Sequence, residues 1–175
     1  MNIQQWIDRN ENWAIGVVTL AALLYAWPNL VHEPLHWLGL KLFGGQGHIV
    51  FNWVTWPAQP YHVHEFIPSI TAGLVYRILP SAVSVGLLSL LWITRKQAAL
   101  LTHIVLPLYL TFDLVTNIMG QSAVGNDFHF LTVINPLFTY IPLIAILILG
   151  YKVIVAGVED EVKEYQKKRL LEVIA

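Results

Sequence analysis

Apolar residues along the chain form long stretches that are separated by short polar segments. A helical stretch crosses about 30 Å of hydrocarbon with about 20 residues, because an α-helix rises about 1.5 Å per residue. Four stretches are long enough, at about residues 13–43, 66–93, 98–119 and 131–158. The pattern predicts an all-α membrane protein with about four transmembrane helices. The first stretch is over-long, so we expect its last part, from about Pro28, to tilt or to line a cavity.

Residues 44–65, between the first two stretches, depart from this helical pattern. Three glycines precede a run in which apolar and polar side chains alternate weakly, and two prolines follow. This composition predicts a short β-like hairpin or loop after the first helix. The aromatic side chains of Trp53, Trp56 and Tyr61 suit a membrane interface.

Positive charges gather on one side of the predicted bilayer. The loop between the second and third stretches and the C-terminal tail carry most of the Lys and Arg residues, whereas residues 44–65 and 120–130 contain none. The positive-inside rule therefore predicts an integral protein of the cell membrane with both termini in the cytoplasm. We expect a single transmembrane domain at residues 1–158 and a charged cytoplasmic helical tail at residues 159–175.

The composition agrees with a membrane solvent. Hydrophobic residues make up 56% of the 175 residues and charged residues only 12%, which is more apolar than a soluble domain of this length needs. The formal net charge of -1 argues against nucleic acid as a partner. Cysteine is absent, so imidazole and carboxylate are the strong metal ligands that the chain can offer.

A His-Glu-x-x-His motif, His32-Glu33-Pro34-Leu35-His36, lies in the last part of the first stretch. Spacing of four residues places both imidazoles on one helix face, where they are candidate Zn²⁺ ligands, with Glu33 beside the metal-bound water as candidate general base and acid. With seven His and seven Glu in 175 residues, multiplied frequencies give roughly 0.01 chance matches. An ionisable cluster inside an apolar stretch is costly unless it is satisfied, which indicates a functional site.

Pro34 occupies a variable position of the motif. A proline inside a helix donates no hydrogen bond to the carbonyl four residues earlier, here that of Leu30, and its ring crowds that carbonyl. We therefore expect a kink at Pro34. If Pro34 instead began a new helix, His32 would precede that helix and the shared face of the two histidines would be lost.

Catalytic zinc usually takes three protein ligands, and two aspartates lie at a compatible depth. We favour Asp127, since the glycines around it allow close backbone approach, although Asp127 is also a candidate helix N-cap. Asp113, inside the third stretch, is the alternative ligand and requires a partner such as Asn117 or a metal-binding imidazole. Candidates for hydrogen bonds to the ligands are Asn117, Asn126 and His64.

The remaining histidines are weaker candidates. His62, His64 and His129 are on the outer side and could bind metal, but we favour interfacial polar roles for them. His103 is too deep on the inner side to reach the same ion. His48 lies in the hairpin segment without an assigned role.

The chain resembles the membrane-embedded zincin metalloproteases, the group that includes the site-2 proteases and small four-helix relatives. The residues that carry the resemblance are His32, Glu33 and His36, the following segment 37–45 with the β-like loop, and the segment 117–127. In that group the first helix carries the metal motif and a distant aspartate completes the site, so the resemblance implies Asp127 as the third ligand. The Asn-Pro-x-x-Asp-Gly form of the site-2 aspartate motif is absent, which favours the broad group.

These features predict a zinc metalloendopeptidase that cleaves membrane-associated or membrane-spanning proteins or peptides. An extended substrate could pair with the strand edge at residues 47–56. The alternative is a zinc-binding membrane protein without hydrolysis, either a transporter or a sensor, which would need a continuous polar path. A structural membrane subunit with incidental histidines is a third interpretation. The substrate and the oligomeric state are not encoded in these patterns.

Overall fold

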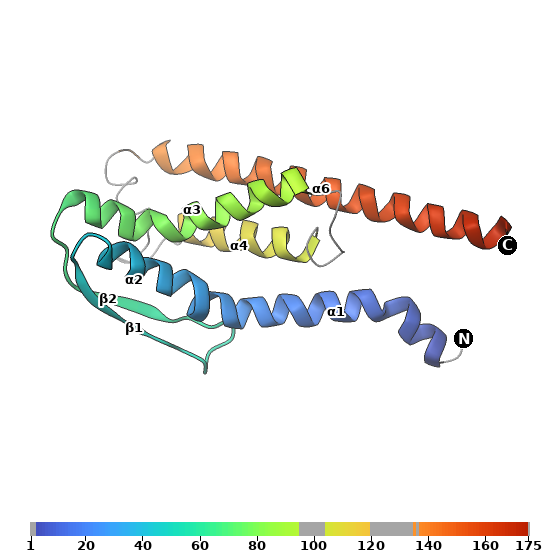
Figure 1. Ribbon diagram of the computed structural model, residues 1–175, viewed down its shortest axis with the longest axis horizontal. Coiled ribbons are helices and arrows are strands. Elements are labelled where there is room, and N and C mark those ends of the chain that lie inside the picture. Colours follow the sequence, from blue (N-terminus) through green and yellow to red (C-terminus); the bar gives the residue numbers. More distant parts are fainter. Residues whose placement is uncertain (1–2, 95–103, 120–134, 136, 175) are drawn as a thin grey trace.

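The computed structural model describes residues 3–94, 104–119, 135 and 137–174. These residues are mostly helical with one small two-stranded hairpin (Figure 1), which confirms the predicted helical class and the predicted hairpin. The elements, in chain order, are α1 (Ile3–Trp27), η1 (Pro28–His32), α2 (Glu33–Lys41), β1 (Gln46–Val50), β2 (Tyr61–Phe66), α3 (Ile70–Thr94), α4 (Leu106–Met119) and α6 (Leu137–Ile174).

Three described helical segments are long and apolar enough to cross a membrane: Trp13–Lys41, Ile70–Thr94 and Thr139–Val173. They correspond to the first, second and fourth predicted spans. The third predicted span is described from residue 104 and contains α4, a helix of 14 residues; the start of this span lies outside the described residues. The helix α6 continues without a break from the apolar span into the charged tail.

The first apolar segment changes its helical geometry directly before the metal motif. Residues Pro28–His32 form a π-helical turn, in which the N–H of Glu33 donates to the carbonyl of Pro28, five residues earlier. Pro34 follows in the first turn of α2, where its missing N–H is tolerated. The disturbance expected from Pro34 thus takes the form of a wider turn just before it, a feature often found at functional sites.

The core lies where α3, α4 and α6 meet. Its fully or nearly fully buried side chains are Leu88, Leu110, Leu114, Ile118 and Ile146. This packing holds α4 against α3 and α6, while large apolar side chains such as Leu90, Ile93 and Ile148 remain on the outside. Exposed apolar surface of this kind suits a molecule whose helices face lipid.

The hairpin folds back along the first helix (Figure 1) and does not extend away from the helices. Its strands are antiparallel, with His48 opposite Val63 and Ile49 opposite His62. Residues opposite each other on paired strands point to the same face of the sheet, and successive residues along a strand point to opposite faces. Ile49 and His62 therefore point to one face, and His48 and Val63 to the other. The strand β1 ends where the Asn52 side chain accepts hydrogen bonds from the backbone N–H groups of residues 54 and 55.

A buried asparagine holds the hairpin loop against the first helix. The Asn29 side-chain amide donates to the carbonyl of Asn52 at 3.0 Å, and its oxygen accepts from the N–H of Asn52 at 3.0 Å. The same amide donates to the carbonyl of Tyr25 at 3.2 Å, and the N–H of Ala58 donates to the carbonyl of Leu24. These bonds set the position of the hairpin beside the metal motif.

Candidate metal centre

The two histidines of the motif lie side by side in the interior. His32 is 7% exposed and His36 is fully buried, and their Nε2 atoms are 3.2 Å apart. The shared face therefore survives the π-helical turn between Pro28 and His32. With one carboxylate oxygen of Glu33, the two imidazoles offer three ligand atoms that lie within 4.8 Å of one another. This buried group could hold a metal ion.

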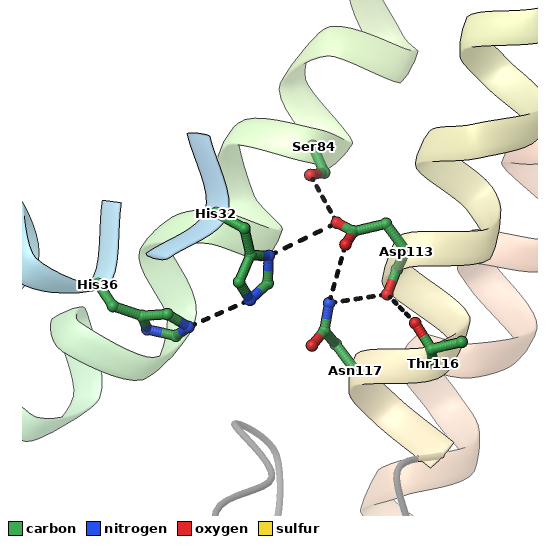
Figure 2. Close-up of polar contacts among 6 residues, drawn as sticks. All are labelled: His32, His36, Ser84, Asp113, Thr116 and Asn117. Atoms are coloured by element: carbon green, nitrogen blue, oxygen red, sulfur yellow. Dashed lines mark hydrogen bonds and ion pairs between the residues drawn. The ribbon is translucent and has the colours of Figure 1, made fainter. Parts of the chain in front are cut away.

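Each imidazole meets a different acceptor through its Nδ1 atom. His36 Nδ1 lies 2.5 Å from the backbone carbonyl oxygen of Tyr76, which can only accept, so this nitrogen carries the proton. His32 Nδ1 lies 3.7 Å from Asp113 Oδ2, which is an ion-pair contact and too long for a hydrogen bond; the negative carboxylate would attract a proton on this nitrogen. Neutral imidazoles protonated at Nδ1 present lone pairs at Nε2. Figure 2 shows the Nε2 atoms of His32 and His36 turned toward each other; with both rings protonated at Nδ1, a cation between them would meet two lone pairs.

The spacing and the donor types fit zinc. Two imidazole nitrogens bound to one tetrahedral zinc, each at about 2.05 Å, lie about 3.3 Å apart. The observed separation of the Nε2 atoms of His32 and His36 is 3.2 Å. Ligating histidines commonly donate their other ring N–H to a carboxylate or a backbone carbonyl. The Tyr76 carbonyl accepts from His36, and the Asp113 carboxylate faces His32 Nδ1 at ion-pair distance.

A proline in α3 accounts for the acceptor that His36 uses. In a regular helix the carbonyl of Tyr76 would accept the N–H of residue 80, but residue 80 is a proline inside α3 and has no N–H. This carbonyl can therefore accept from the neighbouring helix. Gly39 allows the close approach, because a Cβ at this position would lie 3.1 Å from the Tyr76 Cα atom.

Asp113 is buried among polar groups on α3 and α4. Its Oδ2 atom accepts from Ser84 Oγ at 3.4 Å and its Oδ1 atom from Asn117 Nδ2 at 3.3 Å, as Figure 2 shows. Both contacts that the sequence suggested for Asp113, with Asn117 and with an imidazole of the motif, are present. Asp113 faces the Nδ1 side of His32, away from the Nε2 atoms.

Glu33 meets a histidine that the sequence analysis placed among interfacial residues. His62 Nδ1 lies 2.5 Å from Glu33 Oε2. The imidazole of His62 also packs against His36, with ring centroids 4.3 Å apart, and against Tyr76 at 4.8 Å. In the sequence, His62 and His64 are two residues apart, a spacing that places both side chains on one face of a strand. The sequence near His62 does not indicate that this strand would lie beside the motif.

Other predicted site residues are less fully described. Asp127, Asn126, His129 and His103 lie outside the described residues. His64 is exposed and its ring centroid is 5.9 Å from that of Tyr76.

Comparisons of the chain with protein-family models, with curated proteins and with solved structures found no match. In the part of the chain that the structure describes, the fold is mostly helical, three helices are apolar enough for a membrane, and a buried His-Glu-His group could hold a metal.

Proposed function

We propose that this protein is an integral membrane zinc metalloendopeptidase that hydrolyses peptide bonds of membrane-associated or membrane-spanning substrates. The observation that carries the proposal is the pair of Nε2 atoms of His32 and His36, 3.2 Å apart and buried, with the Glu33 carboxylate beside them. The resemblance to membrane-embedded zincins supports the same activity.

In this proposal the residues of the motif have distinct roles. His32 and His36 hold zinc, which when bound acts as a Lewis acid and lowers the pKa of a coordinated water. Glu33 takes a proton from the attacking water and returns it to the leaving amine. Burial of Glu33, 7% exposed, suits this role, because a proton acceptor acts most strongly where bulk water is excluded.

The third zinc ligand is proposed to be Asp127. The position of Asp113 supports this choice, since Asp113 faces His32 Nδ1, while the lone pairs available for metal are at Nε2. Asp113 then acts by orienting His32, a role that carboxylates commonly play behind metal-binding histidines.

The membrane placement follows from the apolar helices and from the distribution of positive charge. Four spans, with both termini in the cytoplasm, put the metal motif toward the outer side of the first span. Substrates would then reach the site from the bilayer or from the outer face, and an extended segment would pair with the strand edge at residues 47–56.

The test uses two variants of the full chain purified in detergent. Glu33→Gln is expected to keep a full equivalent of zinc and to lower the rate of peptide cleavage by about 10²–10⁴-fold, because the proton acceptor is lost. His36→Ala is expected to lose the zinc. Zinc is measured by elemental analysis, and cleavage with a fluorogenic peptide library whose products are identified by mass spectrometry.

Glu65→Gln is the matched control for Glu33→Gln, because the Glu65 side chain is 57% exposed and lies outside the proposed substrate edge at residues 47–56. It should leave both quantities unchanged. Full activity of the Glu33→Gln variant would contradict the protease function. Zinc binding without cleavage by the unmodified protein would favour a zinc transporter or sensor instead.

A further inference from the structure

The hairpin brings one histidine into direct contact with the glutamate of the motif. We propose that His62 is a positioning residue for Glu33, whose Nδ1–H donates to Glu33 Oε2 and holds the carboxylate beside the metal-binding imidazoles. The inference rests on the proposed function. It assigns to the hairpin a role in assembling the site, beyond any role in binding substrate.

The contact is short and removed from water. The Nδ1–Oε2 distance is 2.5 Å, and the side chains of His62 and Glu33 are 18% and 9% exposed. A buried carboxylate is costly without a hydrogen-bonding partner, and a charge-assisted bond to an imidazole N–H is among the stronger ones available. Such a bond restricts the rotation of the Glu33 side chain.

The surroundings of His62 restrict its ring as well. The imidazole packs against His36 at 4.3 Å and edge-on against Tyr76 at 4.8 Å and 86°. Both neighbours belong to the motif or to its support, because the Tyr76 carbonyl accepts from His36. Contacts on two sides fix the direction in which the His62 ring presents its Nδ1 atom. A residue that positions the Glu33 carboxylate must itself have a fixed orientation.

The hairpin carries a second histidine–glutamate pair that serves as a built-in comparison. His48 Nδ1 lies 3.1 Å from Glu65 Oε1, but their side chains are 56% and 57% exposed. This pair is on the opposite face from His62, because His48 is opposed to Val63 and Ile49 to His62. Both pairs join an imidazole to a carboxylate. The pair of His62 and Glu33 is largely buried and includes a residue of the motif, whereas the pair of His48 and Glu65 is exposed and does not.

The experiment compares His62→Ala, His62→Asn and Glu65→Gln in the zinc-loaded full chain; Glu65→Gln alters the exposed pair without touching the proposed substrate edge at residues 47–56. The amide nitrogen of Asn is as many bonds from Cα as His Nδ1 and can donate in its place. We expect His62→Ala to keep its zinc and lower kcat by about 10–100-fold with KM changed by less than about threefold. His62→Asn should recover kcat to within about fivefold of the unmodified protein, whereas Glu65→Gln should match the unmodified protein.

A second readout does not depend on cleavage. Acetohydroxamate chelates zinc and hydrogen-bonds to a carboxylate beside it, so its affinity, measured by calorimetry, reports the position of Glu33. His62→Ala and Glu33→Gln should weaken it to a similar extent, by about tenfold, and His62→Asn should restore it.

Several results would overturn the role of His62. These are an unchanged kcat or acetohydroxamate affinity in His62→Ala, loss of zinc from that variant, or no recovery in His62→Asn. Absence of cleavage by a zinc-loaded, unmodified protein would refute the protease function alone, and the acetohydroxamate affinities would then decide the role of His62. Absence of zinc from the unmodified protein would refute both.

Discussion

The two imidazoles of the motif depend on acceptors of different kinds. His36 donates to a backbone carbonyl, which no side-chain substitution removes, whereas His32 faces the carboxylate of Asp113. Asp113 is in turn held by Ser84 and Asn117. At the scale of single residues, the orientation of His32 is therefore the more vulnerable of the two.

Substitution of Asp113 tests this dependence. Asp113→Asn keeps the volume of the side chain but removes the charge that favours a proton on His32 Nδ1, so zinc affinity should fall by about 10–100-fold. Competition with a chromophoric chelator measures the affinity. Asp160→Asn, on the charged tail beside Lys163, controls for the change in net charge and should leave the affinity unchanged. Loss of zinc as complete as in His36→Ala would identify Asp113 itself as a ligand.

The sequence predicted part of this site. Spacing of four residues identified His32, Glu33 and His36, and burial of an acid in an apolar stretch pointed to a partner for Asp113. Both inferences use only local sequence and the cost of burying charge. The contact between His62 and Glu33 was not predicted, because it depends on the hairpin folding back against the first helix. That position depends in turn on the hydrogen bond from the Asn29 side chain to the carbonyl of Asn52.

At the scale of elements, the helix α3 supports the site through an interruption of its own hydrogen bonding. Pro80 leaves the carbonyl of Tyr76 without the N–H that a regular helix would supply, and His36 uses that carbonyl. The helix thus gives up one internal bond and gains one to α2. The sequence around Pro80 and Tyr76 does not predict the bond to His36. The bond forms only because Gly39 allows α2 and α3 to approach closely.

Replacing the proline should separate stability from metal binding. Pro80→Ala supplies an N–H that competes for the Tyr76 carbonyl, so His36 should be oriented less well and zinc affinity should fall by about tenfold. The helix itself should become no less stable, because proline is about 3 kcal/mol less favourable than alanine in a helix interior. Zinc titration and thermal unfolding of the zinc-free protein measure the two effects.

Pro142→Ala provides the matched control for this prediction. Pro142 is also inside a helix, α6, but lies outside the metal centre, so its replacement should leave zinc affinity unchanged. An equal fall in affinity for both variants, or none for Pro80→Ala, would contradict the role of the Tyr76 carbonyl.

At the scale of the whole molecule, α1 begins and α6 ends at the same end, while α2, β1 and the start of α3 lie toward the other (Figure 1). This arrangement suits a chain that crosses a bilayer an even number of times. Apolar patterning was sufficient to predict the three described helices that are long and apolar enough for a membrane, because such helices are recognised by length and hydrophobicity alone. It could not predict where the hairpin rests, which depends on tertiary contacts.

The absence of cysteine makes the topology directly testable. A single cysteine at exposed Gln46, at the start of β1, should react with a membrane-impermeant maleimide added to intact spheroplasts. A cysteine at Lys167, exposed on the tail, should react only after permeabilisation, since the positive-inside rule places the tail in the cytoplasm. The reverse pattern, or equal labelling at both positions before permeabilisation, would contradict the proposed orientation.

The backbone acceptor of His36 also bears on how related chains can be found. Because the acceptor is a backbone carbonyl, this bond does not depend on which side chain residue 76 carries. It does depend on the proline at position 80, which has no N–H to compete for that carbonyl. Pro80 follows His36 by 44 positions in this chain. A search that joins His-Glu-x-x-His to a proline inside the next long apolar helix would therefore detect chains that share this support for the second histidine, whatever their other residues.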